Sequence, residues 1–478
     1  MDKPGEQGKN KVGLVRQLGL FDSTMILVGI VIGSGIFLTT GIMAKSIPSA
    51  GLILLAWVVG GLLTLAGALT YAELGAAMPE AGGQYVYLRE AYGPLSGFLF
   101  GWILFLVYIP GSIAALAVAF AEYFGYFFPS LSTGRIIFST AIGVFNNSFE
   151  YSLSWGQLVG IAVIMFLSTV NYIGVGFGKI VQNIFTVIKI GIIMAIIILG
   201  FTIGKGTAVD FSLNPTGLSL SHLIIGFGVA LVAVSWAFDG WNNLNFVAGE
   251  IKNPKRNLPF SLVFGTLVLI ILYALTNYIY LYGLPIVEMI GVVRIAEKAT
   301  TALFGGATAA LISAAVMVST FGSLNGTILA GPRVYYAMAR DKLFFRKVGE
   351  VHPRFRTPGF AIIIQAIWAF FLTLSGTFEQ LFTFVMFVAI IFWITAATSV
   401  FTLRRKYPDL PRPYKTWGYP VVPIVFIVAA VGILINTLIE KPVESLAGIG
   451  FTALGIPVYY YWRRKSRQDL NKSNPQEN

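Results

Sequence analysis

The amino-acid sequence predicts an all-α polytopic membrane protein, and its composition and apolar patterning support this fold class. Of the 478 residues, 56% are hydrophobic and only 11% are charged, whereas a soluble domain carries roughly 25% charged residues. Apolar runs of about 20 residues recur along the whole chain, and each is long enough to cross a hydrocarbon core of roughly 30 Å. The alternating segments of roughly 10 residues that are typical of a transmembrane β-barrel do not dominate.

Twelve membrane-spanning helices are expected, separated by short polar segments. Residues 129–153 are expected to form a longer loop on the outer side, and residues 79–95 a polar loop on the cytoplasmic side. The expected spans cover about residues 21–47, 52–78, 96–128, 154–174, 180–203, 222–248, 259–283, 304–338, 359–376, 379–403, 420–439 and 446–462.

Lys and Arg are distributed unevenly between the two sides of the expected membrane. With the N-terminus placed in the cytoplasm, most of the 33 Lys and Arg residues fall in cytoplasmic segments. The positive-inside rule therefore predicts a multi-pass plasma-membrane protein with both termini cytoplasmic. The basic runs "RRKYPDLPRPYK" and "RRKSR" are interpreted as topology signals and contacts with anionic lipid headgroups, not as a nucleic-acid site. The expected outer segments hold only Lys45, Arg135, Lys205, Arg294, Lys298 and Lys441.

The chain lacks the residues that most enzymatic and metal sites need. With no cysteine it can form neither a disulfide nor a thiolate metal site, and its two histidines, His222 and His352, are far apart in the sequence. A membrane-embedded enzyme would need a nucleophile–base pair or metal ligands at membrane depth, and the spans contain neither an HExxH motif nor a central histidine. We therefore expect no enzyme activity, no metal and no cofactor.

Two spans carry residues that a simple membrane anchor would avoid. The run "GIVIGSGIF" (29–37) contains Gly33, Ser34 and Gly35, and "SWAFDGWNN" (235–243) places Asp239 next to Gly240. Glycine in a helix interior costs about 1 kcal/mol relative to alanine. Irregular backbone at membrane depth is tolerated where it is buried in protein or lines a cavity. A glycine pair alone also fits close helix packing, but a matching acidic interruption favours a binding site.

These two spans are the first and the sixth, so the second set of five would run inverted relative to the first. Paired interruptions in inverted halves indicate the midplane site of a transporter. A broken helix exposes N–H groups at its new N-terminus, which attract a carboxylate, and C=O groups at its new C-terminus, which attract an ammonium. A zwitterionic α-amino acid carries both charges on one carbon, so this is the substrate class that the sequence predicts.

Lys189 is the other residue that is unusual at membrane depth. It stands in "NIFTVIKIGIIMAII", far from either end of its span, and a lysine at the bilayer centre costs on the order of 3 kcal/mol on insertion scales. A snorkelling side chain near a helix end is the alternative without a function. A fixed ammonium there can take the place of Na⁺ by bracing spans 1 and 8 through backbone carbonyls and the hydroxyls of Ser319 or Ser323. It can instead carry a coupling proton, and the sequence does not choose between these roles.

In this order and spacing, the chain resembles the amino acid–polyamine–organocation (APC) superfamily, and within it the L-type amino acid transporter (LAT) family. The resemblance extends from about Gly19 to Trp462. It is carried by "GIVIGSGIF", "YAELGAAMPEAGGQYVYLREAYGPL", "VNYIGVGFGKIVQNIFTVIK", "WAFDGWNNLNFVAGEIKNPKRNLP", "STFGSLNGTILAGPRVYYAMARD" and "KPVESLAGIGFTALGIPVYYYW".

The resemblance implies an alternating-access fold of five plus five inverted spans, with helices 1 and 6 discontinuous and two further peripheral helices. The corresponding segments are a cytoplasmic tail (1–20), two five-helix repeats (21–203 and 204–403), the peripheral helices (404–462) and a second cytoplasmic tail (463–478).

It also implies roles for particular residues. Trp236 stands at the family's aromatic gate position and Lys189 at its span-5 lysine. The substrate carboxylate would meet the backbone amides of Ser34, Gly35 and Ile36. The substrate ammonium would meet the carbonyl ends near Ile30, Trp236 and Ala237. The residues expected at the substrate site are Ile30, Gly33, Ser34, Gly35, Ile36, Trp236, Ala237, Asp239 and Gly240.

Two positions depart from the family's pattern. Eukaryotic light chains carry an outer cysteine after span 3, where "FFPSLST" has Leu131. A disulfide-linked heavy chain is therefore excluded, and a free-standing prokaryotic member is expected. Asp239 stands where members selective for large neutral substrates have glycine, and it resembles members that exchange cationic against neutral amino acids. Hydrogen bonding to the broken helix explains this carboxylate equally well, so cationic substrates stay open.

The function expected is sodium-independent exchange of α-amino acids. A proton-coupled symporter is the alternative, and a transporter-like amino acid sensor is a further one from a different class. Sodium coupling is disfavoured, because the Lys189 ammonium and Na⁺ would repel each other at one site.

Overall fold

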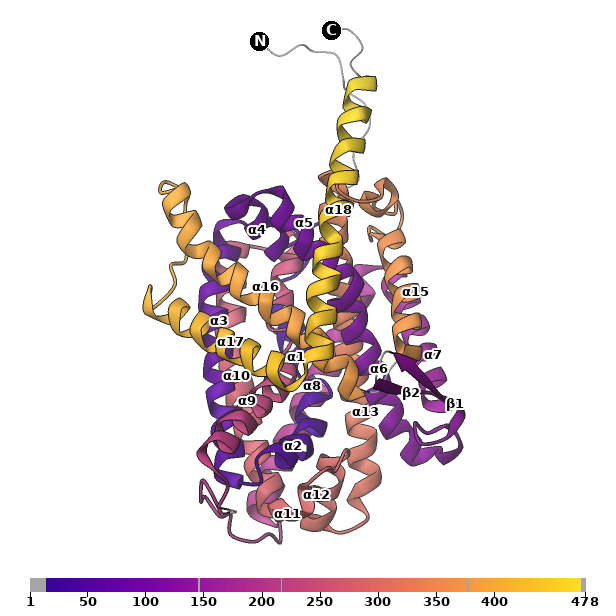
Figure 1. Cartoon of the computed structure of the whole chain (residues 1–478), viewed down its shortest axis with the longest axis vertical. Helices are drawn as coiled ribbons and strands as arrows, with labels where there is room; N and C mark the ends of the chain where they lie inside the picture. The colour runs from indigo at the N-terminus through magenta and orange to yellow at the C-terminus, as the bar shows by residue number, and fades with distance from the viewer. Residues whose placement is uncertain (1–13, 145–146, 216, 376–377, 474–478) are drawn as a thin grey trace.

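The computed structural model describes residues 14–144, 147–215, 217–375 and 378–473, and it is an elongated bundle of helices (Figure 1). Within these residues, ten helical segments are long and apolar enough to cross a membrane. The fold class predicted from the sequence, an all-α polytopic membrane protein, is therefore confirmed. In the first half of the chain the helices are α1 (Leu20–Val31), α2 (Gly35–Ser46), α3 (Ala50–Ala77), α4 (Gln84–Tyr92), α5 (Pro94–Ile103), the π-helix η1 (Leu104–Tyr108), α6 (Ile109–Phe127), the 3-10 helix η2 (Pro129–Leu131), α7 (Trp155–Ile173) and α8 (Val175–Thr202).

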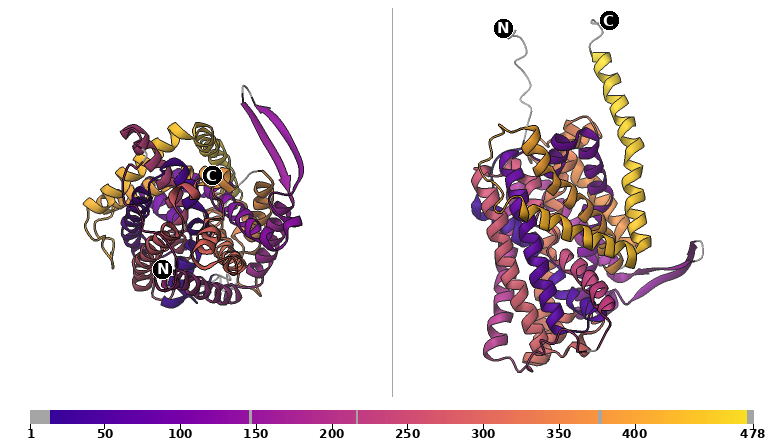
Figure 2. Two further views of the ribbon diagram at one scale, coloured as in Figure 1. Left: turned by 90° about the horizontal axis from the view of Figure 1, so that it is seen from below. Right: turned by 60° about the vertical axis from the view of Figure 1, so that its left-hand side comes forward.

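The second half of the chain is also almost entirely helical. Its long helices run beside those of the first half, and α17 crosses the outside of the bundle obliquely (Figures 1 and 2). The elements are α9 (Leu220–Ala237), the 3-10 helix η3 (Asn243–Glu250), α10 (Pro254–Gly283), α11 (Ile286–Met289), α12 (Ile295–Phe304), α13 (Thr308–Ala330), α14 (Pro332–Arg340), the 3-10 helix η4 (Arg346–Gly349), α15 (Gly359–Ser375), α16 (Phe378–Lys406), α17 (Val421–Glu440) and α18 (Pro442–Ser473).

The expected count of twelve spans is not reproduced in full. The helix α15 is apolar but has only 17 residues, about 26 Å at 1.5 Å per residue. The helix α18 contains the expected span 446–462 but continues into polar residues as far as Ser473. The span expected at 304–338 begins at Thr308, because Gly305 adopts a φ of +93° and separates α12 from α13.

The expected outer loop at 129–153 contains a β-hairpin that was not predicted from the sequence. Strands β1 (Ile136–Val144) and β2 (Asn147–Ser154) pair antiparallel, with a register irregularity between Ile136 and Phe138. This hairpin projects sideways from the helical bundle (Figure 2). The backbone N–H and C=O groups of a projecting segment have no helix in which to form hydrogen bonds. Pairing between the two strands supplies those hydrogen bonds instead.

Contacts at the end of the bundle where the described chain begins hold the segment after α9 in place. The amides of Gln17 and Leu18 both donate to the carbonyl of Glu250, each at 2.9 Å. The Glu250 carboxylate forms a fully buried ion pair with Arg333, in which Nε and Oε1 are 2.7 Å apart. Glu250 therefore connects residues 17 and 18, η3 and α14. These contacts fix where the irregular segment after α9 ends.

Candidate functional site

The first membrane helix is interrupted at the position that the glycines predicted. The helix α1 ends at Val31, the amide of Gly33 donates to the carbonyl of Val31 at 2.7 Å, and α2 begins at Gly35. The first N–H groups of a helix have no partner within it. The amides of Ser34, Gly35 and Ile36 therefore stand at a new helix N-terminus, where the helix dipole favours an anion.

The sixth expected span is interrupted as well, and its helix does not continue to residue 248 as expected. The helix α9 ends at Ala237, a series of turns follows, and η3 begins at Asn243. Gly240 adopts a φ of +92°, a conformation that strains any residue with a side chain. A Cβ atom at Gly240 would also lie 2.3 Å from Cγ2 of Ile30, so the two interruptions are in direct contact.

The N-terminus of α2 meets the C-terminus of α9 closely. A Cβ atom on Gly35 would lie 2.3 Å from the Cα atom of Ala237, so only glycine allows this approach. The indole Nε1 of Trp236 lies 3.4 Å from the hydroxyl of Ser34, to which it donates. The close-packing interpretation of the glycines and the binding-site interpretation therefore apply to the same residues.

A small cavity of about 20 Å³ lies between the two interruptions, with room for about one water molecule. Most of the residues predicted for the substrate site line it, whereas Ile36, Ala237 and Gly240 lie in the interruptions without lining it. An amino acid enters only if part of this lining moves. The lining residues are Ile30, Val31, Gly33, Ser34, Gly35, Ser112, Leu116, Trp236, Asp239, Asn243 and Thr327.

The carbonyl groups expected to meet an ammonium differ in their availability. The carbonyl of Trp236 accepts from the amide of Asp239 at 3.0 Å. The carbonyl of Ala237 lies 3.2 Å from the hydroxyl of Tyr273, which also lies 2.8 Å from the carbonyl of Val31. Tyr273 has one proton and serves one of these carbonyls at a time. The carbonyl of Ile30 lies in the last turn of α1, where carbonyls lack a partner within the helix.

Lys189 lies outside the cavity, directly behind the interruption between α1 and α2. Its Nζ donates to the carbonyls of Gly29 at 2.6 Å and Ile32 at 2.8 Å, and to the hydroxyl of Ser323 at 2.9 Å. The hydroxyl of Ser319 donates to the same Ile32 carbonyl at 3.0 Å. All three N–H groups of the ammonium are therefore used, and the side chain is completely buried.

Glycine at position 322 makes room for this lysine. A Cβ atom on Gly322 would lie 2.8 Å from Cε and 3.1 Å from Nζ of Lys189. The side chain thus passes across α13 to reach α1, and the contact joins α8, α13 and the interrupted first span. The snorkelling interpretation is wrong for Lys189, because its ammonium points into the protein and not toward a helix end.

Asp239 has a different environment from Lys189. The hydroxyl of Tyr108 donates to Oδ1 of Asp239 at 2.6 Å, and the carboxylate lines the cavity with its side chain only partly buried. Nearby, Nδ2 of Asn242 donates to Oε1 of Gln84 at 2.6 Å, and Nε2 of Gln84 donates to the hydroxyl of Tyr71 at 2.8 Å.

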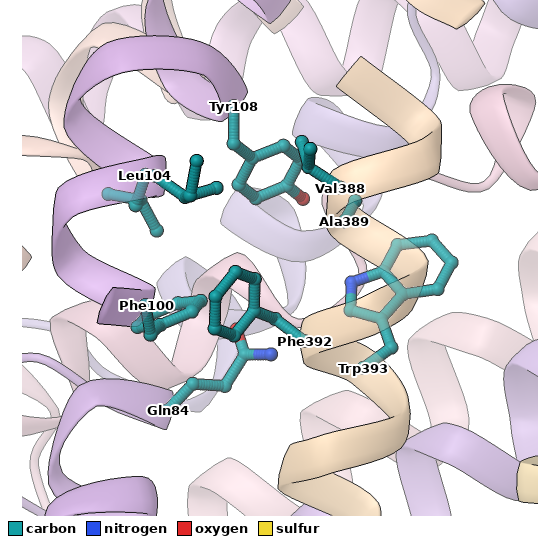
Figure 3. A pocket seen from close by; sticks show the side chains of 9 residues that line it. Gln84, Phe100, Leu104, Tyr108, Val388, Ala389, Phe392 and Trp393 are labelled. Carbon is teal, nitrogen blue, oxygen red and sulfur yellow. The ribbon is translucent and has the colours of Figure 1, made fainter. Parts of the chain in front are cut away.

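A second small cavity, of about 10 Å³, is lined by Tyr108 (Figure 3). Aromatic and aliphatic side chains from α5 and η1 face those from α16 across it, with Gln84 at one end. Tyr108 therefore lines this second cavity and donates its hydroxyl to Asp239, which lines the cavity between the interruptions.

Several cavity-lining residues were not predicted from the sequence. Tyr108 of η1 lines the second cavity. Ser112 and Leu116 of α6, Asn243 of η3 and Thr327 of α13 line the cavity between the interruptions. The available signal for the first three is Pro110 in "YIPGS", because a proline inside a span distorts the helix before it. That distortion is the π-helical turn η1, which ends at Tyr108, and π-turns inside helices are frequent at functional sites.

No group of three His, Asp or Glu side chains among the described residues is placed to hold a metal ion. The polar groups at the site are instead helix ends, hydroxyls, the Asn243 amide, one carboxylate and one ammonium. Two interrupted helices that meet at a buried cavity within a multi-pass bundle define the architecture of a secondary transporter.

The comparisons with known proteins give the family. The amino acid permease family model matches residues 18–456, and the chain belongs to this family. It is 35% identical over 462 residues to the serine/threonine exchanger SteT of Bacillus subtilis, covering 95% of this chain and 98% of that protein. The chain is also 30% identical over 462 residues to the human b(0,+)-type amino acid transporter 1, covering 95% of this chain and 89% of that protein.

A third relative extends the comparison. The human large neutral amino acids transporter small subunit 2 is 30% identical over 471 residues, covering 96% of this chain and 83% of that protein. The similarity to the APC superfamily and its LAT family that the motifs indicated is therefore confirmed, and the protein is an amino acid transporter.

Proposed function

We propose that this protein exchanges α-amino acids across the plasma membrane by alternating access, without sodium. The observation that carries the proposal is the contact between two helix ends of opposite polarity around one cavity. The free amides of α2 favour the substrate carboxylate, and the last carbonyls of α1 favour its ammonium. Exchange is supported by the similarity to SteT, a serine/threonine exchanger.

In this proposal Ser34, Gly35 and Ile36 bind the carboxylate through their amides, and Ile30 binds the ammonium through its carbonyl. Trp236 acts as the gate, because its indole contacts Ser34 and must move to admit a substrate into a cavity of about 20 Å³. Trp236 and Ala237 supply carbonyls only when Asp239 and Tyr273 give up their present hydrogen bonds.

Lys189, with Ser319 and Ser323, replaces sodium in this mechanism. Na⁺ in such a site would require oxygen ligands, and the carbonyls of Gly29 and Ile32 already accept from the ammonium. Asp239 contacts the substrate side chain and allows lysine or arginine in addition to neutral amino acids.

We further propose that both termini are cytoplasmic, as the charge distribution predicts, and that residues 21–203 and 204–403 form the two inverted repeats. The protein works without a disulfide-linked heavy chain, because it has no cysteine. Its partners are therefore small amino acids and the lipid bilayer.

The test uses the full chain purified and reconstituted in liposomes. Uptake of radiolabelled serine, leucine and lysine is measured with and without unlabelled amino acid inside, and with and without a pH gradient, in sodium-free buffer. Exchange predicts uptake that requires internal amino acid. Uptake driven by the pH gradient alone would contradict exchange and indicate a proton-coupled symporter. Binding of substrate without uptake under any condition would indicate a sensor.

A further inference from the structure

A cavity of about 320 Å³ lies between α2, α9 and α17, apart from the cavity between the interrupted helices. Ligand sites for small molecules typically measure roughly 300–1,000 Å³, so this space is large enough for part of an organic ligand. The lining residues are Ile42, Lys45, Ser46, Val229, Val232, Ala233, Asn436, Thr437, Glu440 and Lys441.

The polarity of this cavity changes along the membrane normal. The membrane-spanning segments end at Ser46 and Glu440, so the charged residues Lys45, Glu440 and Lys441 lie at segment ends, where the membrane surface is expected. Ile42 is one turn deeper in α2, and α9 runs inward through Val229, Val232 and Ala233 toward Trp236. The cavity therefore has a charged rim and an apolar floor, which is the pattern that an amphiphile fits and a small polar solute does not.

Polar groups at the rim have unused binding capacity. Within the described part of the chain, neither the ammonium of Lys45 nor the carboxylate of Glu440 has a hydrogen-bond or ion-pair partner. Nδ2 of Asn436 is buried without a hydrogen-bond acceptor, and a buried unsatisfied donor costs about 1–3 kcal/mol. A Cβ atom on Gly228 would lie 2.4 Å from Cγ of Asn436, so glycine there is needed for the amide to reach its position.

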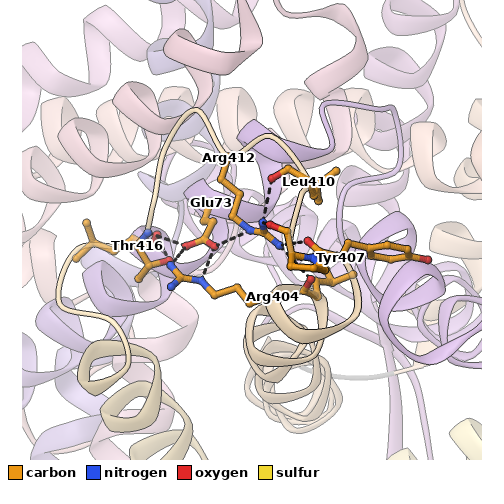
Figure 4. A network of polar contacts seen from close by, with 9 residues as sticks. Glu73, Arg404, Tyr407, Leu410, Arg412 and Thr416 are labelled. Carbon is orange, nitrogen blue, oxygen red and sulfur yellow. Dashed lines mark hydrogen bonds and ion pairs between the residues drawn. The ribbon is translucent and has the colours of Figure 1, made fainter.

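The wall formed by α17 is fixed at its other end. Glu73 accepts from Nε and Nη2 of Arg404, at 2.8 and 2.7 Å, and from the amide of Thr416 at 2.7 Å. Arg412 lies 3.5 Å from the same carboxylate (Figure 4). These contacts hold the segment between α16 and α17 against α3. The opposite walls, α2 and α9, are the two half-helices that carry the interruptions.

We propose that this cavity binds one phospholipid with a phosphate and an ammonium in its headgroup, as in phosphatidylethanolamine, from the leaflet opposite the termini. The phosphate contacts Lys45, the headgroup ammonium contacts Glu440, and the Asn436 amide donates to a lipid oxygen. An acyl chain lies on the floor and on the outer face of α17, where Ile435 is 53% and Ile439 66% exposed. The lipid thereby stabilises α2 and α9 against α17, close to the gate residue Trp236.

The binding test does not depend on transport. The full chain is purified in mild detergent, incubated with mixed phosphatidylethanolamine and phosphatidylcholine, and its retained lipids are counted by native mass spectrometry. We expect wild type to retain one tightly bound phosphatidylethanolamine, and Lys45→Ala with Glu440→Gln to lose it. Gly228→Leu, which displaces Asn436 without changing charge, should lose it as well. Lys205→Ala is the matched control, since Lys205 is exposed and outside the cavity.

Three outcomes would overturn the proposal. They are equal lipid retention by wild type and the Lys45→Ala/Glu440→Gln variant, equal loss in the Lys205→Ala control, and displacement of the lipid by millimolar amounts of a free amino acid. The last outcome would identify the cavity as a second amino acid site. Unfolding of the variant is recognised by size-exclusion chromatography, and the Gly228→Leu result then decides.

A transport measurement gives the functional consequence. In liposomes of phosphatidylcholine alone, we expect wild-type uptake to fall several-fold relative to equal amounts of phosphatidylcholine and phosphatidylethanolamine, and the variant to show no difference. A variant that responds to lipid composition like wild type would contradict the link to α2 and α9. Absence of uptake from all proteins would instead contradict the proposed transport function and leave the lipid count valid.

Discussion

Lys189 and Asp239 are both ionisable side chains beside the interrupted helices, but their surroundings differ. The Lys189 ammonium is completely buried and donates to three oxygens, of Gly29, Ile32 and Ser323. Asp239 receives one short hydrogen bond, from Tyr108, and borders the cavity. A group whose hydrogen bonds are all satisfied inside the protein holds structure together, whereas a group with free acceptors beside a cavity can bind a ligand. This difference supports the proposed roles, which are bracing for Lys189 and substrate contact for Asp239.

The largest effect is expected for Lys189→Ala. The change removes the charged donor from the carbonyls of Gly29 and Ile32. Among the described side chains, only the hydroxyls of Ser323 and Ser319 can then donate to them. A hydrogen bond to a charged group contributes about 1.5–3 kcal/mol. We expect exchange to fall about a hundredfold, which corresponds to about 2.8 kcal/mol, with a lower Tm. Uptake in liposomes and thermal unfolding in detergent measure the two effects.

Lys179→Ala is the matched control for this variant. Lys179 is on the same helix and pairs with Asp22 at 3.0 Å near the protein surface, where such a pair is worth about 0–1 kcal/mol. Equal losses of exchange and of Tm in both variants would contradict a special role for Lys189.

Gly35→Ala should produce the next largest effect. The added methyl group would meet the backbone of Ala237 at 2.3 Å, and overpacking of a rigid contact costs about 1–3 kcal/mol. Moving α2 away from α9 also displaces the amides that are proposed to bind the carboxylate, so the apparent KM should rise at least tenfold.

The matched control for this variant is Gly191→Ala on α8, where an added Cβ meets nothing within 4 Å. Its exchange rate should equal that of wild type. Unchanged transport by Gly35→Ala would show that the contact between α2 and α9 is not needed for substrate binding.

Asp239→Gly is expected to change selectivity and not overall activity. Without the carboxylate, lysine and arginine should lose their ability to compete with labelled leucine, while serine and leucine compete as in wild type. Competition assays in liposomes measure this directly. Retained competition by lysine would make the role of Asp239 structural, as a hydrogen-bond acceptor beside the broken helix.

Tyr108→Phe should have the smallest effect, because it removes one hydroxyl and keeps the ring. The Asp239 carboxylate loses its donor at 2.6 Å, and a hydrogen bond to a charged group contributes about 1.5–3 kcal/mol. Water from the cavity can replace part of it, so we expect only a few-fold change in KM, larger for lysine than for leucine. A uniform loss for both substrates would indicate a packing defect at η1.

The amino-acid sequence determined the class of the protein, because membrane solvation is decided by composition and run length. Few charges and recurring apolar runs allow only a membrane bundle, and glycine or aspartate inside such runs identifies where helices break. The interruptions at residues 32–34 and after Ala237, and the unusual position of Lys189 within its span, could all be anticipated in this way. The hairpin at residues 136–154 could not, since the two residues between its strands are Phe and Asn and not the Asn-Gly or Asp-Gly pair that most strongly indicates a hairpin.

Only the tertiary structure decided which groups meet. The sequence predicted an interruption at Gly33, Ser34 and Gly35, but it did not indicate that Gly35 contacts Ala237. It also did not indicate that Tyr108 donates to Asp239, which is 131 positions away in the chain. It also gave no sign of the cavity between α2, α9 and α17, whose charged residues Lys45 and Glu440 belong to different halves of the protein. A local sequence pattern indicates the free-energy cost of placing a residue at its depth in the membrane. A binding site, in contrast, depends on side chains that only the packing of the helices brings together.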